Sequence, residues 1–192
     1  MTYAATKTRL NEYRAEIAAI REKMRKEQAA VEPEEVHDYT FQTMEGEVRL
    51  SQLFGDKTDL IVIHNMGTSC PACTMWADGF NGIYQHLASR AAFVLTTPDA
   101  PKVQRQFAGD RGWRFPIVSH KGSTFNADMG MTSNDEKFWP GISVFQKKNG
   151  KIVRVSDQEL GPHDDFCALY HFFDMIPEGV ADFRPKFRYF QS

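Results

Sequence analysis

Two cysteines carry the clearest chemistry in this sequence. Cys70 and Cys73 enclose Pro71 and Ala72, and the apolar β-branched run Leu60 to Ile63 precedes them. The run predicts a strand buried on both faces, and the residues after the cysteines have helical spacing. A thiol at the start of such a helix meets unpaired backbone N–H groups and the helix dipole, which both favour the thiolate. We therefore expect a Cys70 thiol with a lowered pKa.

The same spacing lets the two sulfurs bond to each other. The Cys70 thiolate would attack a substrate disulfide, and Cys73, one helical turn further on, would resolve the mixed disulfide. Pro71 fits the first helical turn because no N–H partner is needed there. A zinc half-site is the metal alternative, but a structural zinc takes four Cys or His ligands and no second pair has the spacing. We predict no metal, and no cofactor beyond the Cys70–Cys73 disulfide; a non-catalytic remnant is the remaining alternative.

Composition limits the classes of protein. The 192 residues carry a formal net charge of −2 and are 42% hydrophobic, which suits one domain with an extension and argues against nucleic-acid or membrane-surface partners. No apolar run is long enough for a transmembrane helix, and the first residues lack a secretory signal. Three cysteines do not make a disulfide framework. We expect a cytoplasmic protein, with the third cysteine, Cys167, buried and inert.

The first 35 residues predict a helical extension. Apolar side chains recur at spacings of three and four, as on a narrow helical seam, and Pro33 ends the pattern. These side chains are Leu10, Tyr13, Ile17, Ile20 and Met24. Two interpretations remain open: the helix lies across its own domain, or it is an arm that forms a homodimer with a second copy.

The rest of the chain predicts an α/β domain over residues 36–178 and a tail over 179–192. Strand and helix signals alternate after a first hairpin, and an Asn149-Gly150 turn marks a second hairpin before the last helix, expected from His163 to Met175. This order predicts a three-layer α/β/α sandwich with a central mixed sheet. The aromatic and basic tail is expected to pack across the body or a neighbour.

These parts resemble the thioredoxin superfamily in their order as well as in the cysteine pair. The segment from Trp139-Pro140 to Phe145 resembles the one that carries its cis-proline, and the first hairpin resembles the entry segment of the peroxiredoxin and thiol-disulfide reductase branch. The sequence is similar, more closely, to a bacterial thioredoxin-like family of unassigned function, which carries a basic N-terminal helix and a CP(S/A)C motif. The motif continues with tryptophan and Ala-Asp-x-Phe, here Trp76 and the run Ala77 to Phe80. Gly112-Trp113 also matches.

The resemblance implies roles for residues around the pair. Pro140 would be cis and would shape a groove in which an extended substrate pairs with backbone. His64 takes the place of a buried acid that accepts the proton of the resolving thiol, and an imidazole could do the same; the alternative is a core histidine bonded to backbone. Trp76 and Trp139 are expected beside the thiol, as site wall or as core. Ser69 would bond the Cys70 sulfur or cap the helix.

The leading functional hypothesis is a dithiol-disulfide oxidoreductase that acts on a protein or small-molecule disulfide and is reset by a cellular reductant. A thiol peroxidase is the second. Peroxiredoxins carry Thr or Ser three residues before the reactive cysteine and a proline further upstream, whereas Gly67 stands here and no proline lies between Leu60 and Cys70. The third is a non-catalytic metal-binding or assembly protein on the same scaffold.

Overall fold

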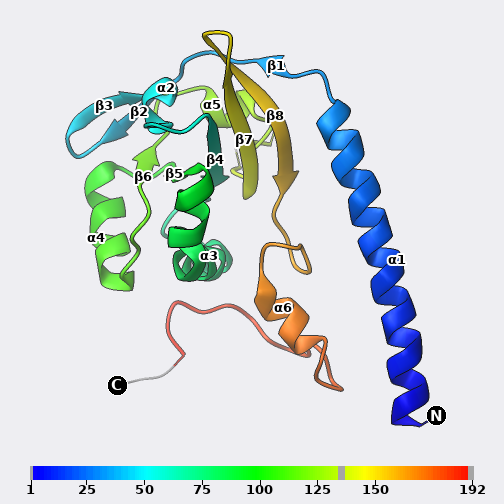
Figure 1. Cartoon of the computed structure of the whole chain (residues 1–192). Coiled ribbons are helices and arrows are strands. Elements are labelled where there is room, and N and C mark those ends of the chain that lie inside the picture. Colours follow the sequence, from blue (N-terminus) through cyan, green and yellow to red (C-terminus); the bar gives the residue numbers. More distant parts are fainter. Residues whose placement is uncertain (1, 134–136, 190–192) are drawn as a thin grey trace. The chain divides into compact units, whose positions relative to one another are not determined.

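The computed structural model describes residues 2–133 and 137–189 (Figure 1). It divides into two compact units, residues 1–34 and 35–192. The first holds α1 (Tyr3–Ala30), whose N-cap Thr2 accepts a hydrogen bond from the Ala5 N–H at 3.3 Å. No residue of α1 is buried. Both interpretations of its apolar seam, packing on its own domain or on a second copy, remain predictions.

The second unit is built on a mixed sheet with helices on both faces. The remaining elements in chain order are β1 (Glu34–Glu35), β2 (Thr40–Thr43), β3 (Gly46–Arg49), α2 (Leu50–Leu53), β4 (Asp59–His64), α3 (Pro71–Arg90), β5 (Ala92–Thr97), α4 (Pro101–Arg111), β6 (Ile117–Ser119), α5 (Phe125–Asp128), β7 (Gly141–Lys148), β8 (Lys151–Glu159) and α6 (Ala168–Phe173). The strand order is β1-β8-β7-β4-β5-β6-β2-β3. The predicted class, a thioredoxin-like α/β fold with a central mixed sheet, is confirmed.

Strand β4 lies at the centre and supports the cysteine loop. It pairs in parallel with β5 and antiparallel with β7, so both of its edges are hydrogen-bonded. Its side chains alternate between two apolar clusters: Leu60 and Val62 face the cluster that holds α5, while Ile61 and Ile63 face the one under α3. Burial on both faces explains why the run reads as continuously apolar.

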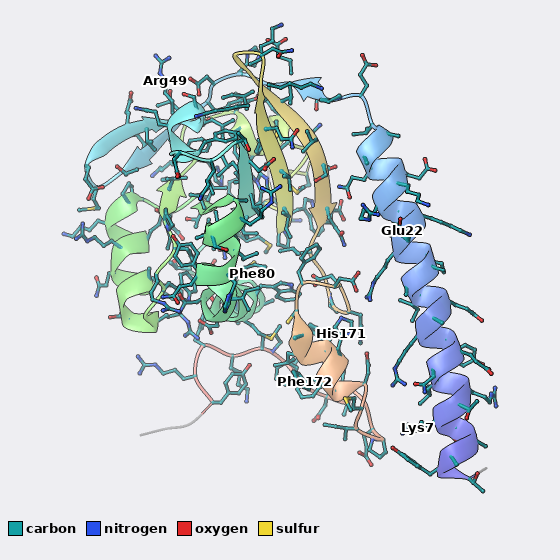
Figure 2. All side chains as sticks on the ribbon, viewed as in Figure 1. Lys7, Glu22, Arg49, Phe80, His171 and Phe172 are labelled. Atoms are coloured by element: carbon teal, nitrogen blue, oxygen red, sulfur yellow. The ribbon has the colours of Figure 1, made fainter. Side chains whose placement is uncertain are left out.

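Helix α3 covers one face of the sheet. Phe80, which Figure 2 labels on this helix, packs edge-on against Phe93 of β5, with ring centroids 6.0 Å apart. The helix begins directly at the cysteine pair, so packing of its buried face fixes where the first cysteine lies. Over the described residues, no helix has both the length and the apolar character needed to cross a membrane.

Candidate functional site

Cys70 is the N-cap of α3. Its Sγ accepts a hydrogen bond from the Cys73 N–H at 3.1 Å, and the Thr74 hydroxyl donates to the Cys70 carbonyl at 2.9 Å. Pro71 occupies the first helical position, as predicted. Ser69 is exposed and is not the cap, because the Cys70 sulfur itself takes that place.

The two sulfurs lie 2.6 Å apart and titrate very differently. A hydrogen bond from the Cys73 thiol, helped by the backbone N–H groups of Cys73 and Ala72, lowers the pKa of Cys70 to about 6 against the opposing effect of burial. That same hydrogen bond and burial raise the pKa of Cys73 far above its usual range. At pH 7 about nine-tenths of Cys70 is therefore thiolate, the nucleophilic form. Cys73, only 5% exposed, keeps its proton.

The loop before Cys70 is held by side chains that the sequence did not single out. The Asn65 Oδ1 accepts a hydrogen bond from the Gly67 N–H at 2.8 Å, and the Asp99 Oδ2 accepts one from the Thr68 N–H at 2.7 Å. Gly67 has φ +100°, where a side chain is strained, and a Cβ there would lie 2.8 Å from the Asp99 Oδ2. The close approach of Asp99 therefore requires glycine.

Gly67→Ala is expected to lower the free energy of unfolding by about 1–3 kcal/mol, because it adds backbone strain and displaces Asp99. Urea denaturation measures the change. The matched control is Gly79→Ala in α3, where a Cβ meets no atom within 4 Å and φ is unstrained. That variant should gain roughly 0.5–1 kcal/mol. Equal changes in the free energy of unfolding at both glycines would contradict the conclusion that the close approach of Asp99 requires glycine at position 67.

A cavity of about 510 Å³ opens beside both sulfurs. It brings together Cys70, Cys73 and four further residues expected at the site, which are His64, Trp76, Trp139 and Pro140. Trp76 is buried, whereas Trp139 is 51% exposed at the rim. Pro71 and Ser69 do not line it.

The prediction of a cis peptide bond before Pro140 is wrong: no peptide bond in the described chain is cis. The backbone on both sides of this proline is already paired within the chain. The Pro140 carbonyl accepts a hydrogen bond from the Leu160 N–H at 2.9 Å, and the Trp139 N–H donates to the Met131 carbonyl at 2.9 Å.

Asp164 links the loop before α6, which borders the cavity, to α3. Its Oδ2 accepts hydrogen bonds from the Trp76 indole at 2.8 Å and from the Gly161 N–H at 3.0 Å. Its Oδ1 accepts from the N–H groups of Phe166 and Cys167 at 2.7 and 2.9 Å. This carboxylate therefore orients one of the predicted tryptophans and shapes the loop that borders the cavity.

The C-terminal segment, residues 179–189, completes the cavity. It leaves α6 and runs towards α4 (Figure 1), where the Arg111 guanidinium donates to the Phe187 carbonyl at 3.0 Å. Phe183 packs edge-on against Phe173 of α6, with centroids 5.0 Å apart. Val180, Phe183, Arg184 and Pro185 all line the cavity. The tail thus packs across the body, and it contributes to the candidate site.

Comparison with known proteins places the sequence in a family. Residues 2–191 match the family described as "Bacterial protein of unknown function (DUF899)". The chain belongs to the DUF899 family. No functionally curated protein matches it.

Solved structures similar to this DUF899 chain include several peroxiredoxins. The peroxidoxin BcpB from Mycobacterium tuberculosis superposes with a TM-score of 0.58 at 21% identity, over 71% of this chain and 88% of that one. Reduced Prx3 from Vibrio vulnificus in complex with hydrogen peroxide gives 0.54 at 12% identity, over 70% and 87%. A PrxQ mutant from Xylella fastidiosa gives 0.56 at 12% identity, over 66% and 84%. At these identities the similarity establishes the fold.

Asp78, from the Ala-Asp-x-Phe run, has a structural place in this DUF899 chain. Its carboxylate pairs with the Arg111 guanidinium and accepts a hydrogen bond from the Trp113 indole at 2.8 Å. The Ala-Asp-x-Phe run and the Gly112-Trp113 pair, which both belong to the family resemblance, are therefore in contact. This contact joins α3 to the end of α4. This contact supports the helix that carries the cysteines.

His64 lies on the face of the sheet opposite α3. Its ring stacks on Phe125 of α5, with centroids 5.3 Å apart. Its Nδ1 lies 2.7 Å from the Asn126 Oδ1 and its Nε2 2.8 Å from the Ser143 Oγ. The Asn126 amide nitrogen donates to the Met131 carbonyl, so its oxygen must accept from Nδ1–H. Burial lowers the pKa of His64 to about 4, and the neutral Nε2 accepts from Ser143.

This geometry favours the core-histidine interpretation, but the ring nitrogens bond to the Asn126 and Ser143 side chains and not to backbone as that interpretation expected. The relay remains a prediction. His64→Ala should lower the free energy of unfolding by roughly 3 kcal/mol, through a cavity and two unpaired buried groups. It should leave the pH dependence of Cys70 alkylation unchanged. Iodoacetamide alkylation across pH 5 to 9 tests this, and a shifted profile at full folding would restore the relay.

Cys167 is 6% exposed, and burial raises the pKa of its thiol, as expected of an inert cysteine. Among the described residues, no group of three or more His, Cys, Asp or Glu side chains is arranged to hold a metal ion.

Proposed function

We propose that this protein is a dithiol-disulfide oxidoreductase whose nucleophile is Cys70 and whose resolving thiol is Cys73. The setting of Cys70 carries the proposal. Its thiol has a pKa of about 6, its sulfur lies 2.6 Å from the Cys73 sulfur, and it lines the cavity. A thiolate next to a protonated thiol is the arrangement that attack and resolution require. The oxidised pair would be reset by a dithiol reductant of the cell.

The proposal is tested by single-turnover mixing of the reduced protein with a disulfide. We expect Cys70 and Cys73 to be lost together, one pair for each disulfide reduced, while Cys167 stays alkylatable after unfolding. Mass spectrometry after rapid alkylation gives the stoichiometry. A Cys70→Ser variant should react no faster than the uncatalysed background. An unchanged rate of reaction with the disulfide in that variant would contradict the proposal.

Thiol peroxidase activity is the second candidate, because several similar folds are those of peroxiredoxins. In that reaction the Cys70 thiolate would attack one peroxide oxygen, and the O–O bond would break to leave a sulfenic acid and a hydroxide that takes up a proton as water. The Cys73 thiol would then condense with the sulfenic acid to form the disulfide and release a second water. Stopped-flow oxidation by hydrogen peroxide separates the two activities. We expect peroxide to react with the pair more slowly than a disulfide does, since Gly67 replaces the hydroxyl residue of peroxiredoxins. The reverse order would favour the peroxidase.

A further inference from the structure

We propose that the Cys70–Cys73 pair acts on a small, mainly apolar disulfide that carries an anionic group, and that Arg184 binds this group. The inference rests on the proposed function and specifies its substrate class.

The cavity has the size and lining of a small-molecule site. About 510 Å³ lies within the range of roughly 300–1,000 Å³ typical of ligand pockets. Most of its wall is apolar, formed by Trp76, Leu160 and Val180 among others, with Phe183 from the C-terminal segment. That segment is held at two points, by Phe183 against Phe173 of α6 and by the Phe187 carbonyl, which accepts from Arg111 of α4. A small molecule fits a space of this size and lining.

An extended polypeptide also lacks its usual place to bind. Peptides that add to a sheet edge are held by free backbone N–H and C=O groups. Beside the cysteines, the Trp139 N–H already donates to Met131 and the Pro140 carbonyl already accepts from Leu160. These internal hydrogen bonds favour a substrate that is recognised by its side groups.

The charges at the wall favour an anion. Of the described residues that line the cavity, none has a carboxylate, and Arg184 is the only one with a permanent charge. One guanidinium nitrogen donates to the Phe183 carbonyl at 2.9 Å, which fixes its position at the rim. Burial raises the pKa of the cavity residue Tyr170, and the positive charge of Arg184 partly opposes this rise. The remaining guanidinium N–H groups suit a carboxylate.

The reaction balances without a cofactor. The Cys70 thiolate attacks one substrate sulfur, the substrate S–S bond breaks, and the first product leaves as a thiolate. Cys73 then loses its proton and attacks the Cys70 sulfur, which releases the second product thiol and leaves a Cys70–Cys73 disulfide. The substrate gains two electrons, which the protein thiols lose. A cellular dithiol returns them.

Two aromatic disulfides and one variant pair test the inference. The anionic probe is 5,5′-dithiobis(2-nitrobenzoate), and the uncharged probe is 4,4′-dithiodipyridine; both release coloured thiols. Arg184→Gln should slow the anionic probe about fivefold, the scale of a partly exposed ion pair, and leave the neutral probe unchanged. Arg188→Gln removes the same charge from the same segment but does not line the cavity, so it should change neither rate. Insulin should be reduced no faster by the wild type than by Cys70→Ser.

The outcomes separate the two proposals. If Arg184→Gln slows both probes equally or neither, or if Arg188→Gln matches it, anion recognition by Arg184 is overturned while thiol exchange stands. Rapid reduction of insulin overturns the small-molecule class in the same way. If neither probe oxidises the Cys70–Cys73 pair, the proposed function itself fails.

Discussion

A Cys73→Ser variant is expected to accumulate a stable mixed disulfide through Cys70, whereas the wild type releases its product. The serine hydroxyl retains a donor at the place of the Cys73 thiol, 2.6 Å from the Cys70 sulfur, but cannot attack the mixed disulfide. Intact-mass spectrometry after mixing with 5,5′-dithiobis(2-nitrobenzoate) should show one added thionitrobenzoate on nearly every molecule. In the wild type the adduct should be transient.

Two further variants control this experiment. Cys70→Ser should form no adduct, since Cys73 holds its proton and is buried. Cys73→Ala removes the first cause of the lowered Cys70 pKa, so alkylation of Cys70 at pH 7 should slow by roughly tenfold. A persistent adduct on the Cys70→Ser protein would reverse the roles of the two cysteines.

The strand and helix that position Cys70 could be predicted because their signals are local. The run Leu60 to Ile63 shows burial on both faces, and Pro71 belongs to a first helical turn. The tail was expected to cross the body, but its part in the cavity depends on Phe183 meeting α6, which no local pattern encodes.

Residues that act over long sequence distances could not be predicted in the same way. Asp99 reaches a loop 31 positions earlier, and Asp164 reaches Trp76 across 88 positions. Asp164 also explains why the last helix is α6 (Ala168–Phe173) and not 163–175: its carboxylate holds two N–H groups in a loop before the helix. A Trp-Pro pair is compatible with either isomer, so the resemblance alone misassigned Pro140.

Acid is expected to destabilise the fold through two buried histidines. Burial lowers the pKa of His64 and of His120 to about 4, and both side chains are at most 3% exposed. Between about pH 6.5 and pH 4 the unfolded chain therefore binds more protons than the folded one, so stability falls as pH falls. From pH 7 to pH 4.5 the free energy of unfolding should drop by about 2 kcal/mol per histidine. Urea denaturation of the reduced protein at both values measures it.

His120 offers the sharper test of this pH dependence. Its Nε2 has no hydrogen-bond partner in the described structure, so replacing the side chain breaks no hydrogen bond at that atom. Its ring packs edge-on against Phe138, with ring centroids 5.1 Å apart. His120→Gln should therefore remove about half of the stability loss between pH 7 and pH 4.5, while His86→Gln, on the exposed side of α3, should remove none. If the two variants respond alike, the acid sensitivity arises from other groups, because only a histidine buried in its neutral form resists protonation while folded.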